Sequence, residues 1–142
     1  MNCLFKAFCA LFALLVLWLF VSAALRGSPK NAEMARREVA DYHARYNKLQ
    51  FREIHRTLDP SARWPDEKEY ARVMLANRSK WGAFISSSEV GARFFVGTNG
   101  RFITLQYESR YFGGNVDETF VFRMSNDRAL LNSYTILKDM FH

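Results

Sequence analysis

The alternation of apolar and polar residues predicts β-strands in the second half of the chain. From Arg101 to Tyr111 the odd positions are mostly apolar or aromatic and the even positions polar, a period of two that is typical of a strand with one buried face. The same alternation continues from Val116 to Met124, where Glu118 is the one charged residue on the apolar parity. These two segments therefore predict two strands that each bury one face.

Two further segments are rich in strand-forming residues. Phe84 to Val96 is the longer one, and Gly91 within it indicates a bend or bulge. Ala129 to Leu137 is apolar on both parities, which is typical of a central strand that is covered on both sides. Turn-forming residues separate the four strands at 97–100, 113–115 and 125–127. Such short connections predict an antiparallel meander.

Helical periodicity precedes the strands. Ser28 and Pro29 are typical of an N-cap and a first helical residue, and the helix should run to about Asn47. Its expected buried stripe is Ala35, Val39, Tyr42 and Tyr46. A short helix would carry Phe51, Ile54 and Leu58, and a third would start near 65–67 and bury Tyr70, Val73, Met74 and Trp81. Three helices followed by four strands predict an α+β domain with the helices packed on one sheet face.

The amino-terminal segment predicts membrane insertion. Ala7 to Leu25 carries no charge, and its length approaches the roughly 20 residues needed to cross a bilayer core. We expect a transmembrane signal anchor over residues 1–26, a linker over 27–30 and a globular domain over 31–142. Small residues also permit the alternative of signal cleavage after Ala23 or Ala24, which would release the domain to the periplasm.

The flanking charges leave two topologies open. Lys6 precedes the apolar segment, whereas Arg26, Lys30, Arg36 and Arg37 follow it, and a count of positive charges would place the domain in the cytoplasm. A short tail followed by a folded domain is the usual arrangement of exported bacterial domains. We therefore expect a single-pass protein of the inner (cytoplasmic) membrane with its domain on the periplasmic side.

Composition narrows the classes of function. The 142 residues carry a net charge of +6, and the basic residues are spread along the chain rather than gathered in a stripe, which argues against nucleic-acid binding. The two cysteines, Cys3 and Cys9, precede the domain, so no disulfide or cysteine metal site is expected within it. The histidines share no metal-binding spacing, and we predict no metal and no cofactor.

Candidate chemistry is sparse, and no catalytic residue can be assigned. Glu118 should face inward, where it would either pair with an arginine, such as Arg101, Arg110 or Arg123, or contact a ligand in a pocket. Tyr107 and Tyr134 would supply hydroxyls to the same cavity or pack in the core. The histidines His43, His55 and His142 are each interpreted as surface or helix-edge residues.

Several motifs together resemble the nuclear transport factor 2-like superfamily. They are the helical stretch 46–54 ending at Leu58-Asp59-Pro60, then 81–84, 103–107, 112–114 with 118–120, and 130–136. The pattern is similar to a group of small exported or membrane-anchored bacterial domains, with Asn132-Ser133 standing where a glycine is expected. The resemblance implies a curved sheet that wraps the helices into a cone with a pocket at its open end.

Two hypotheses about function follow. The first is a membrane-tethered, non-enzymatic binding or assembly module of the cell envelope, which engages an envelope protein, a second copy or a small ligand. The number of phenylalanines in the strands favours it, since one sheet face cannot easily bury Phe94, Phe95, Phe102, Phe120 and Phe122 together. The alternative is a small-molecule isomerase or dehydratase-like enzyme that uses Glu118 as a base and a tyrosine as a hydrogen-bond donor.

Overall fold

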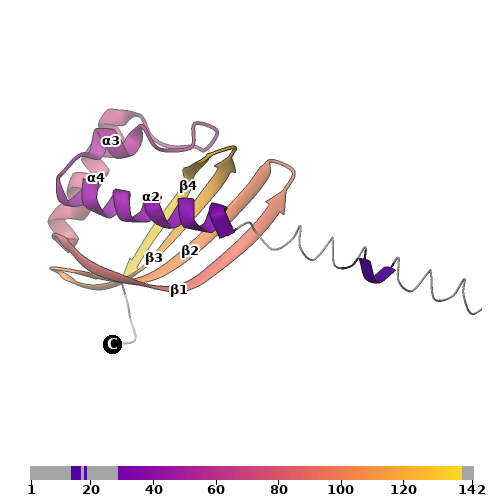
Figure 1. Ribbon diagram of the computed structural model, residues 1–142. Coiled ribbons are helices and arrows are strands. Elements are labelled where there is room, and N and C mark those ends of the chain that lie inside the picture. The colour runs from indigo at the N-terminus through magenta and orange to yellow at the C-terminus, as the bar shows by residue number, and fades with distance from the viewer. Residues whose placement is uncertain (1–13, 17, 19–28, 139–142) are drawn as a thin grey trace, which may run out of the picture.

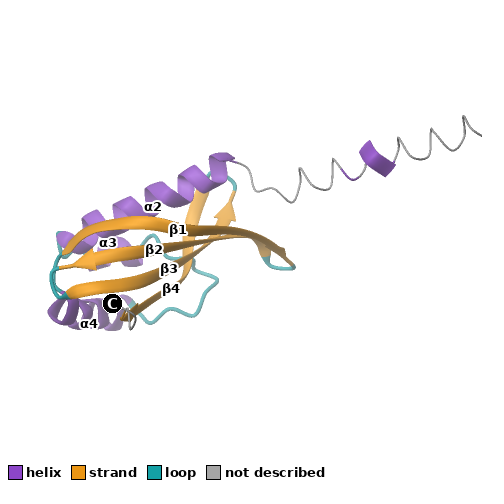
Figure 2. Cartoon of the chain, turned by 90° about the horizontal axis from the view of Figure 1, so that it is seen from below, coloured by secondary structure: helices purple, strands orange, loops and turns teal. Residues whose placement is uncertain are grey.

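The computed structural model describes residues 14–16, 18 and 29–138, and its fold is α+β (Figure 1). The helices are α2 (Pro29–Asn47), α3 (Phe51–His55) and α4 (Glu67–Trp81). The strands are β1 (Phe84–Gly97), β2 (Gly100–Tyr111), β3 (Gly114–Ser125) and β4 (Arg128–Lys138). The strands form one curved antiparallel sheet, and the helices lie on its inner side (Figures 1 and 2).

The sheet is the predicted meander, with strand order β1-β2-β3-β4. The prediction that the last strand is central was wrong, because β4 lies at the edge of the sheet. A register shift explains its apolar residues on both parities: Phe122 pairs with Leu131 and Val121 with Ser133, so Asn132 is an extra residue. Leu131 is buried before this bulge, and Tyr134 packs on the core after it.

The bend predicted at Gly91 is confirmed. Glu89 pairs with Tyr107 and Gly91 pairs with Gln106, so Val90 is an extra residue in β1. A second irregularity lies between Phe84 and Ser86 at the start of the strand.

The helices largely follow the predicted bounds, but the prediction that the short helix carries Leu58 was wrong, because α3 ends at His55 and Leu58 is buried beyond it, bridged to Leu131. The four stripe residues predicted for α2 are all buried, and α4 begins after Asp66, whose side chain accepts a hydrogen bond from Glu69 N at 2.9 Å. Tyr70, Met74 and Trp81 are buried, but the prediction for Val73 was wrong, because this side chain is 45% exposed. The predicted N-cap, Ser28, lies outside the described residues.

The core fills the space between the helices and the inner face of the sheet. Ile103 and Leu105 of β2 and Phe120 and Phe122 of β3 are fully or almost fully buried, and Tyr42 of α2 packs its ring edge-on to Phe120 at 5.3 Å between centroids. The large inward residues therefore come from the two central strands, as their alternation predicts.

Within residues 14–16, 18 and 29–138, no helix combines the length and apolar content needed to cross a membrane. The predicted anchor over 1–26 and the alternative cleavage positions Ala23 and Ala24 lie almost wholly outside these residues. The domain boundary and the localisation therefore stay predictions from the sequence.

Candidate functional site

A buried carboxylate, Glu118, lies at the centre of a polar cluster inside the core. Glu118 is 1% exposed, and its Oε2 lies 2.9 Å from Nε2 of His43. Its Oε1 accepts hydrogen bonds from the hydroxyls of Tyr111 at 2.7 Å and Tyr134 at 2.6 Å. We call these four residues the Glu118 cluster. Each carboxylate oxygen therefore has at least one partner from the protein itself.

Four elements meet in the Glu118 cluster. Glu118 projects from β3, Tyr111 from the end of β2 and Tyr134 from β4, while α2 places His43 against them from the other layer. The imidazole of His43 also stacks on the ring of Phe84 at 3.7 Å between centroids. The prediction of a surface or helix-edge His43 was wrong, because the residue is 3% exposed.

The predicted arginine partner of Glu118 was also wrong. Arg110 and Arg123 occupy the parity opposite to the buried positions of their strands, and Arg101 lies at the far end of β2. Arg123 instead binds Asp59 through two hydrogen bonds of 2.7 Å each. A histidine from the helix layer replaces the arginine that the sheet was expected to supply.

The protonation of the cluster is set by burial and by its own hydrogen bonds. Burial raises the pKa of Glu118, but the hydrogen bond and charge of His43 and the hydrogen bond from Tyr134 outweigh it and hold that pKa below its ordinary value. Burial and the charge of Glu118 raise the pKa of Tyr111 far above its usual range, and burial, mainly, does the same for Tyr134. Both hydroxyls thus stay protonated and donate to an ionised carboxylate.

The structure brings together only two of the three candidates that the sequence suggested. Tyr134 binds Glu118 directly, whereas the hydroxyl of Tyr107 lies 3.4 Å from Oε2 of Glu89, although Tyr107 and Glu118 are paired across the sheet. The residues missed as site residues are His43 and Tyr111. A signal existed for both: His43 follows Val39 of the buried stripe by four residues, and Tyr111 is on the apolar parity of β2.

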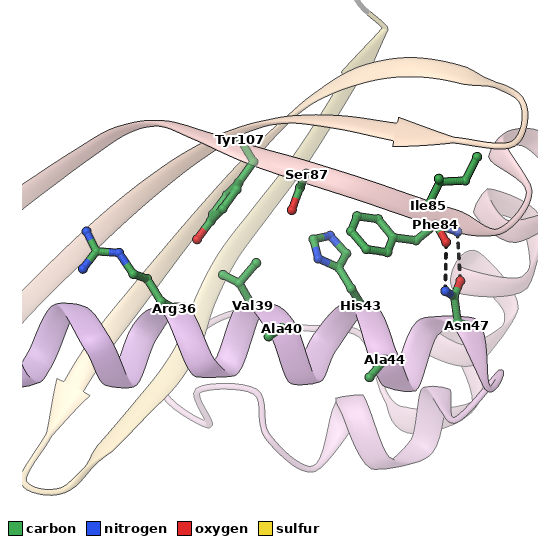
Figure 3. Close-up of a pocket in the computed structure, with 10 residues that line it drawn as sticks. All are labelled: Arg36, Val39, Ala40, His43, Ala44, Asn47, Phe84, Ile85, Ser87 and Tyr107. Carbon is green, nitrogen blue, oxygen red and sulfur yellow. Dashed lines mark hydrogen bonds between the residues drawn. The ribbon is translucent and has the colours of Figure 1, made fainter.

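An open groove lies beside the cluster, between α2 and β1 (Figure 3). Its volume is about 400 Å³, and Val39, Ala40, Ala44 and Phe84 contribute apolar lining. His43 is the member of the Glu118 cluster that lines the groove, and no described residue is hydrogen-bonded to its Nδ1. Tyr107, one of the three candidates from the sequence, also lines the groove (Figure 3). The groove therefore reaches the imidazole but not the carboxylate behind it.

Two polar links span the groove at its ends. Arg36 of α2 donates to both carboxylate oxygens of Glu89, at 2.7 and 2.9 Å. At the other end Asn47 Nδ2 donates to the carbonyl oxygen of Phe84 at 2.9 Å, and the Phe84 N–H donates to Asn47 Oδ1 at 2.8 Å (Figure 3). These links hold α2 beside β1 and leave the space between them open.

The groove follows an unpaired sheet edge. In the described part of the chain β1 pairs with β2 alone, so its other edge has no strand neighbour. The Asn47 amide satisfies both backbone groups of Phe84 as a neighbouring strand would. The remaining edge of β1 can thus offer backbone donors and acceptors to another extended chain.

Asp59 forms the second buried charged site. It is fully buried, and besides Arg123 it accepts hydrogen bonds from Asn132 at 2.9 Å and from the N–H and hydroxyl of Ser61. Asn132, the bulge residue, stands where the resemblance predicts a glycine, and its side chain helps to satisfy the buried carboxylate of Asp59. No group of three or more His, Cys, Asp or Glu side chains that could hold a metal occurs among residues 29–138 or the four described residues before them.

Neither the protein-family models nor the curated proteins searched contain a match to this chain.

Proposed function

We propose that this chain is a membrane-tethered, non-enzymatic binding module of the bacterial cell envelope. Its groove between α2 and β1 receives an extended segment of another envelope protein. The observation that carries the proposal is that both carboxylate oxygens of Glu118 are already paired with side chains of the protein itself. Glu118 is the carboxylate at an inward-facing core position of the sheet, so the accessible feature beside it is the groove.

The Glu118 cluster fits a structural role better than a catalytic one. A general base must lie within hydrogen-bond reach of a substrate proton. Glu118 is buried, and three donors already surround its oxygens. The cluster joins α2 to three strands, so it fixes the helix layer against the sheet.

The groove has features that suit an extended polypeptide. An added strand obtains its affinity from main-chain hydrogen bonds to a sheet edge and its specificity from pockets for alternate side chains. The unpaired edge of β1 can supply the main-chain hydrogen bonds, and the space beside Ala40 and Ala44 can supply a pocket for side chains. The outer sheet face is a weaker candidate, because its central strands present Thr104, Gln106, Thr119 and Asp117 at positions between the buried ones.

The proposal keeps the family and the localisation expected from the sequence. A helix layer on the inner side of a curved four-stranded meander supports a cone-shaped domain of the nuclear transport factor 2-like kind. The uncharged segment 7–25 supports a single inner-membrane anchor with the domain on the periplasmic side.

One observation favours a second candidate, an isomerase or dehydratase-like enzyme. Nδ1 of His43 is not hydrogen-bonded to any described residue, and His43 lines the groove. In that alternative His43 is the base and Glu118 orients its ring, as a carboxylate behind a histidine does in other enzymes.

Site-specific photo-cross-linking in the native membrane tests the proposal. A photoreactive amino acid replaces Ala44, which is exposed and lines the groove, or Leu75, which is also exposed but lies on α4. We expect one defined protein adduct from position 44 and none from position 75. Equal labelling, or an adduct that contains only a second copy of the chain, would contradict the proposed partner.

The variant His43→Gln separates the two candidates. Glutamine can still donate a hydrogen bond to Glu118, but it cannot act as a base. A binding module should keep its adduct from position 44 in this variant. A folded wild type that gives no protein adduct from position 44 would instead favour the small-molecule enzyme.

A further inference from the structure

The start of α2 and two of the three turns between strands lie at one end of the domain. In an antiparallel meander, the β1–β2 turn and the β3–β4 turn lie at the same end of the sheet. The amino terminus of α2 lies there too, since Lys30 Nζ is 3.4 Å from Asp127 Oδ1 in the β3–β4 turn. Figures 1 and 2 show the start of α2 toward the same end as these turns.

The β1–β2 hairpin at this end exposes apolar side chains. We call residues 93–102 the hairpin tip. Phe95 is 63% exposed and Val96 58%, and Phe102 lies beside Phe95 at 6.2 Å between ring centroids. The phenylalanines of the neighbouring strand β3, Phe120 and Phe122, are buried in the core. The strand phenylalanines that the core does not bury therefore lie mainly at this hairpin tip.

Basic side chains flank the exposed apolar residues. Arg93 and Arg101 are exposed within the hairpin tip, and Arg128 is exposed at the start of β4, next to the β3–β4 turn. No described acidic residue is hydrogen-bonded to Arg93 or Arg101 or forms a salt bridge with them. Exposed aromatic residues beside arginines match the interface of an anionic bilayer, where aromatic rings lie at the headgroup level and basic side chains contact phosphates.

The covalent connection limits how far this end can be from the apolar segment. Leu25 is the last residue of that segment and Pro29 the first of α2. Four residue steps span at most about 14 Å even when fully extended. An anchor in the bilayer thus keeps the start of α2, and with it this end of the domain, close to the headgroups.

We propose that the hairpin tip docks on the anionic lipid surface of the membrane that holds the tether. Phe95 and Val96 enter the interfacial layer, and Arg93 and Arg101 bind lipid phosphates. The docking rests on the proposed membrane tether. It gives the domain a fixed orientation, in which the opposite β2–β3 turn, with Phe112, points away from the bilayer.

A fluorescent label reports whether the tip touches lipid. The full chain, with Cys3→Ser and Cys9→Ser, carries a label on Val96→Cys or, as matched control, on Phe112→Cys, which is 84% exposed at the opposite turn. It is reconstituted in vesicles of equal parts phosphatidylcholine and phosphatidylglycerol that contain a lipid-borne quencher. We expect severalfold stronger quenching at position 96 than at 112. The charge reversal Arg93→Glu with Arg101→Glu should reduce quenching at 96 to the level at 112.

Alkaline extraction separates failure of docking from failure of the tether. If the chain stays in the vesicles but positions 96 and 112 are quenched equally, the docking is overturned and the tether stands. If chemical cross-linking instead joins position 96 to a second copy of the chain in the vesicles, the lipid surface is also the wrong occupant. If extraction releases the chain, both the tether and the docking are overturned.

Discussion

His43 and Glu118 are 75 residues apart in the sequence, and their Nε2 and Oε2 atoms lie 2.9 Å apart in the core. The pair connects the helix layer to the middle of the sheet. Because both side chains are almost completely buried, removing the carboxylate of Glu118 leaves its hydrogen-bonding partners in a poorly solvated site. We therefore expect a substitution of Glu118 to destabilise the fold strongly.

Glu118→Gln should lower the free energy of unfolding by about 3 kcal/mol, because the amide nitrogen or oxygen cannot replace both charged oxygens toward His43 and the two tyrosines. Denaturant unfolding of the full chain in detergent measures the change. Glu108→Gln, an exposed change on β2, is the matched control and should shift stability by no more than about 0.5 kcal/mol. Equal effects would show that the Glu118 cluster does not stabilise the fold.

The buried carboxylate of Asp59 should make the folded protein less stable in acid. The hydrogen bonds from Arg123, with those from Asn132 and Ser61, hold the pKa of Asp59 far below its ordinary value despite burial. Its contribution is therefore complete above the unfolded pKa of about 3.9 and is lost as the pH falls below that value toward the folded pKa. Melting temperatures from pH 7 downward should fall more steeply below about pH 4 in the wild type than in Asp59→Asn. Asp117→Asn, an exposed change, should leave the wild-type slope intact.

The phenylalanines of the sheet should divide into two classes. Phe120→Ala opens a cavity at a fully buried position and should cost about 3–5 kcal/mol of unfolding free energy. Phe95→Ala removes a mostly exposed ring and should change stability by less than about 1 kcal/mol. The two variants can be compared by the same denaturant titration. A large loss in Phe95→Ala would place the hairpin tip in the core rather than on a docking surface.

Asn47→Ala should loosen the start of β1. The substitution removes two hydrogen bonds to the backbone of Phe84, and we expect a cost of about 1–2 kcal/mol together with faster hydrogen exchange of the Phe84 amide. Lys48→Ala, an exposed neighbour on the chain, is the control. Unchanged exchange at Phe84 would show that the side chain of Asn47 does not close this end of the groove.

The elements could be predicted from the sequence because their signals are local. Alternation in β2 and β3 and the stripe of α2 depend on residues a few positions apart. The edge position of β4 could not be predicted, because its mixed parity arises from a bulge at Asn132, which binds Asp59, 73 residues earlier in the chain. A local pattern does not report such a contact.

In the candidate site too, contacts between residues far apart in the sequence could not be predicted. Glu118 was found because it breaks the parity of its strand, and Tyr134 was found with it. The partner His43 was missed, since its neighbour depends on how α2 is positioned over β3. Tyr107 is on the correct face of β2, but its hydroxyl is drawn to Glu89, which Arg36 holds at the edge of the groove.

Hydrogen exchange along β1 tests the central claim, that the groove beside this edge receives an extended partner segment. Exchange is compared between the chain in native membrane vesicles and the purified chain in detergent, with the amides of β2 as the internal reference. The account predicts that β1 amides directed away from β2 exchange at least about tenfold more slowly in the native membrane, because a partner strand occupies them. Identical rates for these amides in both samples would contradict it.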